Sequence, residues 1–319
     1  PDSLLEKAWL QWQLDLQWRK ARDAAGDQGI ALLGDLPFTV ASDSADVWAN
    51  QKVFRPDLHV GTPPDDFAAE GQDWGLPAYD WNQLRKSEFG WIRARAARGS
   101  VLFSGYRVDH VIGLYRTFVR NTADGESSFW PAHEAAQIAL GETLIRIMRT
   151  TAEVIAEDLG TVPPFLRPSL DRLAVPGYRV LRWEKENGGY RDPGTYPKLS
   201  VATNGTHDTD STADWYEALP ADDRAHLAKI PGLEGLATEA RFTDKVRDLL
   251  LAALYRAPSQ IVIQPFQDLL GHRERINVPG TVSDTNWSYR MPMTVEALEK
   301  DTATIARLAQ LAQEFGRHR

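Results

Sequence analysis

A repeated alternation of short apolar runs with longer helical patterns constrains this 319-residue chain more than any other feature. Each apolar run ends in a polar or charged side chain and is followed by a loop and then by a helical pattern. This alternation is typical of an α/β protein with a parallel sheet covered by helices. The runs that fit a strand lie at residues 30–35, 105–109, 153–158, 178–183, 199–204 and 260–264.

Helical periodicity marks several of the segments between these runs. Residues 136–149 and 244–257 carry apolar side chains three or four positions apart, which predicts that one face of each helix covers the sheet. Near the start of the chain, Leu5, Trp9 and Trp12 fall on one helical stripe. The sequence therefore also predicts an amphipathic helix that ends near residues 26–29.

Two stretches depart from the alternation. Residues 37–81 are rich in Pro, Gly, Asp and aromatic side chains without periodicity, so we expect a long functional loop inside an insertion at about 37–104. A smaller insertion, rich in Gly and charge, is expected at about 184–197. We expect residues 1–319, with these insertions, to form one catalytic domain, because α/β barrels of this length occur as single domains.

Composition excludes several classes of function. The formal net charge is −8, so nothing supplies the basic surface that a nucleic acid partner requires. With no cysteine, disulfides, thiolate zinc sites and a cysteine nucleophile are excluded. No apolar run approaches the roughly 18 residues that span a bilayer, and no signal peptide is recognisable. We therefore expect a cytoplasmic protein without a membrane or nucleic acid partner.

Polar residues gather where the predicted strands end, which in α/β barrels is the edge that carries the active site. The residues at these positions are Asp35, Arg107, Asp109, Glu157, Asp158, His207 and Asp208. Three carboxylates without cysteine or a metal-type histidine pair indicate glycoside chemistry, in which one carboxylate attacks carbon and another handles the proton.

Purely structural explanations exist for each of these groups. Arg107 and Asp109 are two residues apart on one strand face and would equally form a buried ion pair in a barrel interior. Glu157 and Asp158 would also serve as a helix cap, and His207 with Asp208 would fit a turn. The residue pattern alone leaves these alternatives open.

Longer strings identify a family resemblance. In the first third the strings are GDLP at 34–37, ASDSADVWA at 41–49, PPD at 63–65, GQDWG at 71–75 and YDW at 79–81. Further along are YRVDH at 106–110, AEDLG at 156–160, GTHD at 205–208, NVPGT at 277–281 and NW at 286–287. In this order, across nearly the whole chain, they closely resemble the amylomaltases, the 4-α-glucanotransferases of glycoside hydrolase family 77.

The resemblance implies a retaining transglycosylase that needs no cofactor and acts on maltooligosaccharides or longer α-glucans. Asp109 matches the nucleophile that forms a covalent glycosyl-enzyme, and Arg107 would keep it charged and oriented. Glu157 matches the acid and base, a role that needs a raised pKa. Retention further predicts that the carboxyl groups of Asp109 and Glu157 lie roughly 5–5.5 Å apart.

The remaining site residues follow from the same resemblance. Asp208, assisted by His207, would bind the 2- and 3-hydroxyls of the reacting glucose, with Asp35 as a further acid beside that sugar. Gln72 and Trp74 match a flexible loop over the cleft, where an indole would stack on the glucan.

For three further tryptophans and one asparagine, the question is whether the side chain contacts the substrate or packs in the structure. Asn286 and Trp287 match a segment that lines the acceptor side, where binding and structural roles stay open. For Trp48 and Trp81 we expect core packing rather than stacking on the substrate.

The implied fold is a TIM (β/α)8 barrel with subdomain insertions, of which this chain carries strands three to eight. The first two strands have no counterpart here, so the rest of its own polypeptide is expected as a partner. Alternatives are an α-amylase-like hydrolase, which uses the same carboxylates, and a non-catalytic glucan-binding module. A metal-dependent hydrolase fits least, because the seven histidines are scattered, and we expect activity to resist EDTA.

Overall fold

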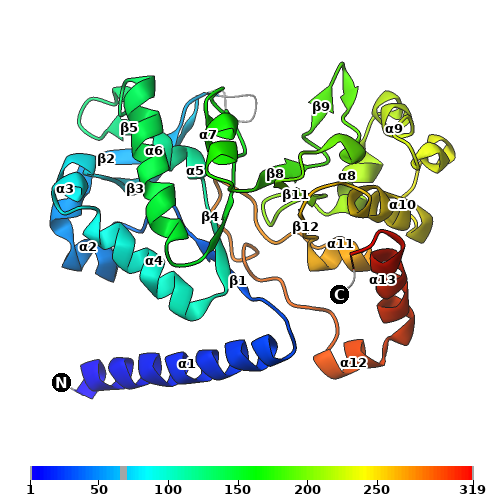
Figure 1. Cartoon of the computed structure of the whole chain (residues 1–319), viewed down its shortest axis with the longest axis horizontal. Coiled ribbons are helices and arrows are strands. Elements are labelled where there is room, and N and C mark those ends of the chain that lie inside the picture. The colour runs from blue at the N-terminus through cyan, green and yellow to red at the C-terminus, as the bar shows by residue number, and fades with distance from the viewer. Residues whose placement is uncertain (1, 65–69, 318–319) are drawn as a thin grey trace. The chain divides into compact units, whose positions relative to one another are not determined.

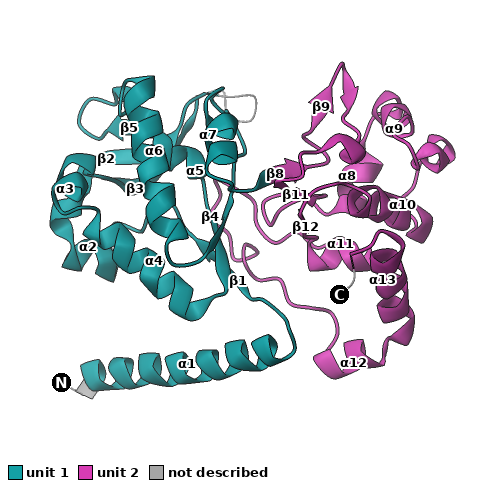
Figure 2. Cartoon of the chain, viewed as in Figure 1, with its two compact units in different colours: residues 1–177 teal, residues 178–319 magenta. Residues whose placement is uncertain are grey.

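The computed structural model describes residues 2–64 and 70–317, in two compact units of residues 1–177 and 178–319 (Figures 1 and 2). Asp65, the last residue of the PPD string, lies outside the described residues. Within the described ranges, no helix combines the length and the apolar character that crossing a membrane requires.

Unit 1 contains parallel strands whose carboxyl ends carry most of the predicted acidic residues. The strands are β1 (Leu33–Leu36), β4 (Gly105–Val108) and β7 (Glu153–Ala156). β4 lies between the other two, and Gly177 at the start of β8 pairs with Ala156. The register aligns Leu36 with Val108 and Val108 with Ala156, so the residues that follow each strand emerge at one edge.

A second, antiparallel sheet in unit 1 corrects the expectation of a loop at 37–81. Its order is β3-β2-β5-β6, formed by β2 (Phe54–Thr62), β3 (Gln72–Tyr79), β5 (Thr117–Asn121) and β6 (Ser127–Trp130). Proline, glycine and register shifts between Arg55 and His59 and between Val60 and Gly61 interrupt the alternation in β2 and β3. That interruption hides the strands from a search for period two.

Unit 1 also contains a group of helices. They are α1 (Asp2–Asp27), α2 (Ala45–Ala49), the 3-10 turn η1 (Gln51–Val53), α3 (Trp81–Lys86), α4 (Gly90–Leu102), α5 (Val111–Tyr115), α6 (Glu134–Arg149) and α7 (Leu166–Arg172). Of these, α4, α5 and α6 contact the strands of unit 1. α6 packs on α4 and α5, burying Leu140, Leu144 and Ile147, as its periodicity predicts. α1 is a helix as expected, although Leu5, Trp9 and Trp12 are exposed. Trp18 instead connects this helix to α4, since its Nε1 donates a hydrogen bond to the Leu102 carbonyl.

Unit 2 holds the remaining predicted strands and a group of helices. Its strands are β8 (Gly177–Val180), whose first residue belongs to unit 1, β9 (Lys185–Glu186), β10 (Gly189–Tyr190), β11 (Ser200–Thr203) and β12 (Ile261–Val262). Its helices are α8 (Thr212–Ala218), α9 (Ala221–Leu227), α10 (Asp244–Tyr255), α11 (Phe266–Leu270), α12 (Val295–Lys300) and α13 (Thr302–Glu314), with 3-10 turns η2 (Pro193–Thr195) and η3 (Glu234–Thr238). β11 pairs in parallel with β12.

All of the predicted strand positions therefore contain a strand, each shorter than expected. β1 begins at Leu33 rather than at residue 30, and β12 comprises Ile261 and Val262 alone. The parallel α/β class is confirmed. Trp81 packs in the core at 1% exposure as expected, whereas Trp48 is 78% exposed, so the prediction of core packing is wrong for Trp48.

Candidate active site

Arg107 is the centre of a charged cluster at the strand ends of unit 1. Its Nη1 donates to Asp35 Oδ1 at 2.7 Å and to Oδ2 at 2.8 Å, and its Nη2 lies 2.8 Å from Asp109 Oδ1. Arg107 belongs to β4, and its side chain is largely buried while both carboxylates stay accessible. The guanidinium therefore orients two carboxylates from neighbouring strands toward the same edge.

The charge of this guanidinium is stabilised by its surroundings. Burial alone would lower the pKa of Arg107, but the carboxyl groups of Asp109, Asp35 and Glu157 outweigh it and hold the pKa above its ordinary value. The predicted pairing of Arg107 with Asp109 is thus present. The contact to Asp35 was not anticipated from the sequence, because it requires the register that places β1 beside β4.

Glu157 follows β7 directly and is fixed by the backbone of the neighbouring strand end. Its backbone N–H donates to Val108 O at 3.0 Å, and its Oε2 accepts a hydrogen bond from the His110 N–H at 2.8 Å. His110 is the residue after Asp109. One short segment of chain therefore carries one carboxylate and positions the other.

Glu157 has a pKa raised to about 8. Burial is the main cause, and the neighbouring negative charge of Asp109 adds to it, while Arg107 and the His110 N–H act in the opposite direction. At neutral pH its carboxyl group is therefore mostly protonated and is ready to donate a proton. A carboxyl group that is protonated at neutral pH, beside an accessible carboxylate paired with arginine, is the arrangement that acid-assisted nucleophilic displacement at a sugar carbon requires.

His110 is a residue that sequence reasoning did not single out. Its backbone is left-handed, with φ 42°, and it immediately precedes α5. Its ring packs edge-on against Phe38 and Trp74, with centroids 5.7 Å and 5.0 Å away. Burial lowers its pKa to about 4, so the ring is neutral near pH 7. The signal that the sequence offered was its place directly after Asp109.

Gly113 makes room for this histidine. A Cβ at Gly113 would lie 2.8 Å from His110 and 2.8 Å from Phe38, closer than real side chains approach. The absence of a side chain lets α5 approach the ring and hold the His110 backbone in its left-handed conformation. Packing in α5 therefore controls the N–H group that binds Glu157.

Gln72 and Trp74 lie on β3 rather than in a loop. Trp74 Nε1 donates to Gln72 Oε1 at 3.0 Å, and the Trp74 ring contacts His110. Trp74 is half-buried against the core of unit 1. The contact of Trp74 with His110 brings this pair next to the segment that carries Asp109, on a strand whose pairing with β2 skips Trp74 and Gly75.

Asp208 lies in unit 2, in a turn after β11. Asn277 Nδ2 donates to Asp208 Oδ1 at 2.6 Å, and His207 Nε2 lies 3.3 Å from Oδ2. Arg275 Nη2 donates to the Asp208 carbonyl at 2.8 Å, and the Asn277 N–H donates to the His207 carbonyl at 3.0 Å. The position of this carboxylate therefore depends on its own turn, at residues 207–208, and on residues 275–277, which are distant in sequence.

Trp287 and Asn286 occupy different surroundings. The Trp287 ring lies 5.1 Å from His207 and is 66% exposed, on a residue whose φ is 59°. Asn286 instead closes the turn at 278–281, since its Oδ1 accepts from Val278 N at 3.1 Å and its Nδ2 donates to Thr281 O at 3.1 Å. Only Trp287 of this pair presents an accessible surface beside His207.

Asn277 is not among the site residues that the sequence predicts, although it belongs to the NVPGT string at 277–281. Its hydrogen bond to Asp208 connects positions 69 residues apart. Within the described part of the chain, no group of three or more histidine, aspartate and glutamate side chains has the arrangement of a metal site.

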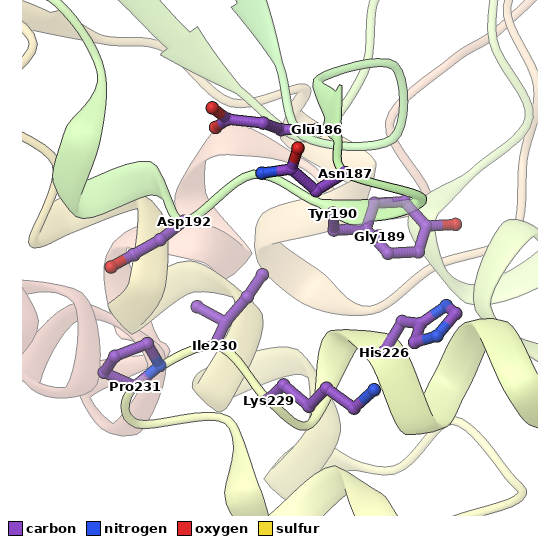
Figure 3. Close-up of a pocket in the computed structure, with 9 residues that line it drawn as sticks. All are labelled: Glu186, Asn187, Gly189, Tyr190, Asp192, His226, Lys229, Ile230 and Pro231. Atoms are coloured by element: carbon purple, nitrogen blue, oxygen red, sulfur yellow. The ribbon is translucent and has the colours of Figure 1, made fainter.

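A separate hollow of about 260 Å³ lies in unit 2 between the β9–β10 hairpin and the end of α9 (Figure 3). Asn187 and Tyr190 line one side, and His226 and Lys229 line the other. The hollow includes none of the predicted site residues, and its lining mixes both signs of charge.

Comparison with known proteins agrees with the resemblance. A family model described as 4-alpha-glucanotransferase, that of glycoside hydrolase family 77, matches residues 2–295. A 4-alpha-glucanotransferase of Chlamydia muridarum is 33% identical over 321 residues, covering 95% of this chain and 60% of the relative. One from Chlamydia pneumoniae is 32% identical, covering 93% of this chain and 58% of the relative.

A solved structure is also similar. The amylomaltase from Streptococcus agalactiae in complex with acarbose superimposes with a TM-score of 0.80 at 27% identity, covering 95% of this chain and 61% of that one. The chain thus spans about 60% of the length of the relatives that it matches.

Proposed function

Because the chain belongs to glycoside hydrolase family 77, the 4-alpha-glucanotransferase family, we propose that it transfers α-1,4-glucan segments between maltodextrins with retention of configuration. The observation that carries the proposal is the contrast between two carboxyl groups at adjacent strand ends. Asp109 is accessible and paired with Arg107, whereas the pKa of Glu157 is raised to about 8. Environments that separate two carboxyl groups in this way assign a nucleophile and an acid.

In the first displacement, Asp109 attacks the anomeric carbon of the donor glucose and forms a covalent β-glycosyl ester. The glycosidic C–O bond breaks, and Glu157 transfers its proton to the departing oxygen. Glu157 begins this step protonated at neutral pH, as its raised pKa requires. Arg107 interacts with Asp109 throughout and keeps its attacking oxygen oriented.

In the second displacement, the 4-hydroxyl of an acceptor sugar replaces the leaving group. Glu157, now a carboxylate, removes the proton of that hydroxyl as its oxygen attacks the anomeric carbon and the ester to Asp109 breaks. Two inversions give net retention. Trp74 beside His110 provides an apolar surface that favours a sugar over bulk water, which is what transfer rather than hydrolysis needs.

The remaining site residues are proposed to bind the sugar. Asp208, oriented by Asn277 and His207, takes the 2- and 3-hydroxyls of the reacting glucose, and contacts that strengthen in the transition state accelerate the reaction. Asp35 serves as a further acid beside the same sugar, and Gln72 and Trp287 as additional contacts. Asn286 shapes the turn that precedes Trp287.

We also propose that β1, β4, β7, β8, β11 and β12 correspond to strands three to eight of a (β/α)8 barrel. Support comes from the parallel pairing of β1 with β4, of β4 with β7, of β7 with β8 and of β11 with β12, and from the TM-score of 0.80 to an amylomaltase structure. The cytoplasmic location expected from the sequence also stays a proposal.

A maltotriose time course tests the proposed activity. The full-length protein should convert maltotriose into glucose and a ladder of longer maltodextrins, as resolved by thin-layer chromatography. Glu157→Gln should remove the ladder. Products no longer than maltotriose would instead assign an α-amylase-like hydrolase, and the absence of any turnover would favour a glucan-binding module.

A further inference from the structure

Trp48 is an exposed tryptophan that the proposed mechanism does not use. It belongs to α2, a short helix with no buried residue, and 78% of its surface is accessible. Single exposed apolar residues are common and need no explanation. Trp48, however, borders a hollow of about 400 Å³, within the range of roughly 300–1,000 Å³ typical of small-molecule sites.

The lining of this hollow combines an apolar surface with hydrogen-bonding groups. Val47, Phe54 and Pro56 join Trp48 as the apolar part. The polar part consists of hydroxyl, amide and carboxyl groups, supplied by Ser42, Ser44, Gln51 and Asp43. No lysine or arginine lines it, so an anionic ligand such as a phosphate is disfavoured and a neutral polyhydroxyl ligand fits better.

The surroundings of the hollow are held in place by the fold. Phe54 is buried and packs edge-on against Trp91, with ring centroids 5.2 Å apart. Ser44 caps α2 through the Val47 N–H at 3.3 Å. Ser42 Oγ donates to the Gly75 carbonyl at 3.2 Å, which ties the segment before α2 to the strand that carries Trp74. Because these contacts already hold the lining residues in place, a bound ligand would lose less affinity to the cost of ordering them.

We propose that this hollow is an accessory site for the α-glucan, in which the C–H face of one glucose unit packs on the Trp48 indole. The hydroxyl rim of the sugar then meets Ser42, Asp43 and Gln51, while the glucan's reacting end is handled elsewhere by Asp109 and Glu157. The choice of ligand rests on the proposed function. The site retains a polymeric substrate near the enzyme and takes no part in bond breaking.

The test measures glycogen binding by affinity gel electrophoresis, using full-length protein that carries Glu157→Gln so that the ligand is not consumed. Trp48→Ala should raise the apparent Kd for glycogen about tenfold, the effect of losing one stacking contact of moderate strength. Trp48→Phe should restore part of the affinity. Trp9→Ala is the matched control, because Trp9 is also exposed, at 54%, but does not line this hollow.

With Glu157 intact, Trp48→Ala should turn over maltotriose within about twofold of wild type and melt at the same temperature. Unchanged glycogen affinity in Trp48→Ala, or an equal loss in Trp9→Ala, would overturn the accessory site. If the protein makes a ladder from maltotriose but binds glycogen equally well with and without Trp48, the accessory site is refuted and the proposed transferase activity stands. Trp48-dependent glycogen binding without any ladder upholds the accessory site and refutes the proposed transferase activity instead.

Discussion

The two units present their acidic residues in different ways. In unit 1, Asp109 and Glu157 come directly after strands whose pairing register is fixed, and Glu157 is further held by the His110 N–H. In unit 2, Asp208 lies in a turn and is held by side chains from residues 275–277, which form no helix or strand. In unit 1 the positions of both acids follow from strand pairing, whereas the Asp208 carboxylate is held by side chains from a segment without helix or strand.

This difference suggests a division of tasks. Groups that exchange a proton or form a bond must be positioned within about half an ångström, which strand ends provide. A group that binds hydroxyls tolerates more adjustment and can be supported by a loop. We therefore expect substitutions in unit 1 to lower kcat most strongly, and substitutions around Asp208 to have smaller effects.

The largest effect is expected for Asp109→Asn. An amide cannot form the glycosyl ester, so kcat should fall on the order of 10⁴-fold or more while the melting temperature changes little. In Asp208→Asn, kcat should fall about 10²-fold, as expected when a charged contact made in the transition state is removed. Steady-state kinetics on maltotriose measures both, and equal losses would erase the distinction between the units.

The pH dependence of unit 1 provides the next test. Glu157 must be protonated for the first displacement, so kcat/KM should fall about tenfold per pH unit above its pKa of about 8. His110, with a pKa of about 4, is neutral throughout this range and does not account for that limb. A basic limb that begins near pH 5 would contradict the assignment.

The same shift has a consequence for stability. The pKa of Glu157 is raised above its ordinary value of 4.5. The contribution of Glu157 to the free energy of unfolding is therefore fully present below about pH 4.5 and is lost as the pH rises through about 8. Glu157→Gln does not titrate. Its melting temperature should therefore increase relative to wild type as the pH rises from about 4.5 to 8, as thermal unfolding scans would show.

A smaller effect is expected from Gly113→Ala. The added Cβ would collide with His110 and Phe38 and displace the N–H group that binds Glu157. Overpacking of this kind costs roughly 1–3 kcal/mol of stability, and we expect kcat to fall about tenfold or more. Ala139→Gly is the control, because Ala139 is exposed on α6. If the loss of kcat comes from the collision at Gly113 and not from a helix substitution in general, this control should leave kcat unchanged.

The smallest effect is expected from Asn277→Ala. Losing the 2.6 Å hydrogen bond removes one of the contacts that hold the Asp208 carboxylate, so kcat/KM should fall about fivefold to tenfold. Asn286→Ala serves as the comparison because it disturbs a nearby turn without contacting Asp208. A loss in Asn286→Ala as large as that in Asn277→Ala would show that loop shape rather than this bond matters.

Most of the unit 1 strand positions were predictable because the local pattern carries the information. An apolar run that ends at Asp109 or Glu157 indicates both the strand and the edge at which the acid lies. The pairing of Arg107 with Asp109 also follows from two-residue spacing on one strand face. The contact of Arg107 with Asp35 does not, because it depends on which strands are neighbours.

Features created by distant contacts were missed. The sequence predicts a loop at β2 and β3 because their prolines and register shifts remove the alternation, whereas in the fold β2 pairs with both β3 and β5. Asn277 reaches Asp208 across 69 positions. Core packing is expected for Trp48, but α2 buries none of its residues.

A trapped intermediate would show directly whether Asp109 bonds to the sugar while Glu157 exchanges the proton. α-Maltotriosyl fluoride needs no acid to expel its leaving group, so Glu157→Gln should accept the sugar but, lacking the base, should release it slowly. Intact-protein mass spectrometry should then show an added maltotriosyl group, and peptide mapping should locate it on Asp109. An adduct on Asp208 or Asp35, or no adduct when fluoride is released, would contradict the role of Asp109 as the nucleophile.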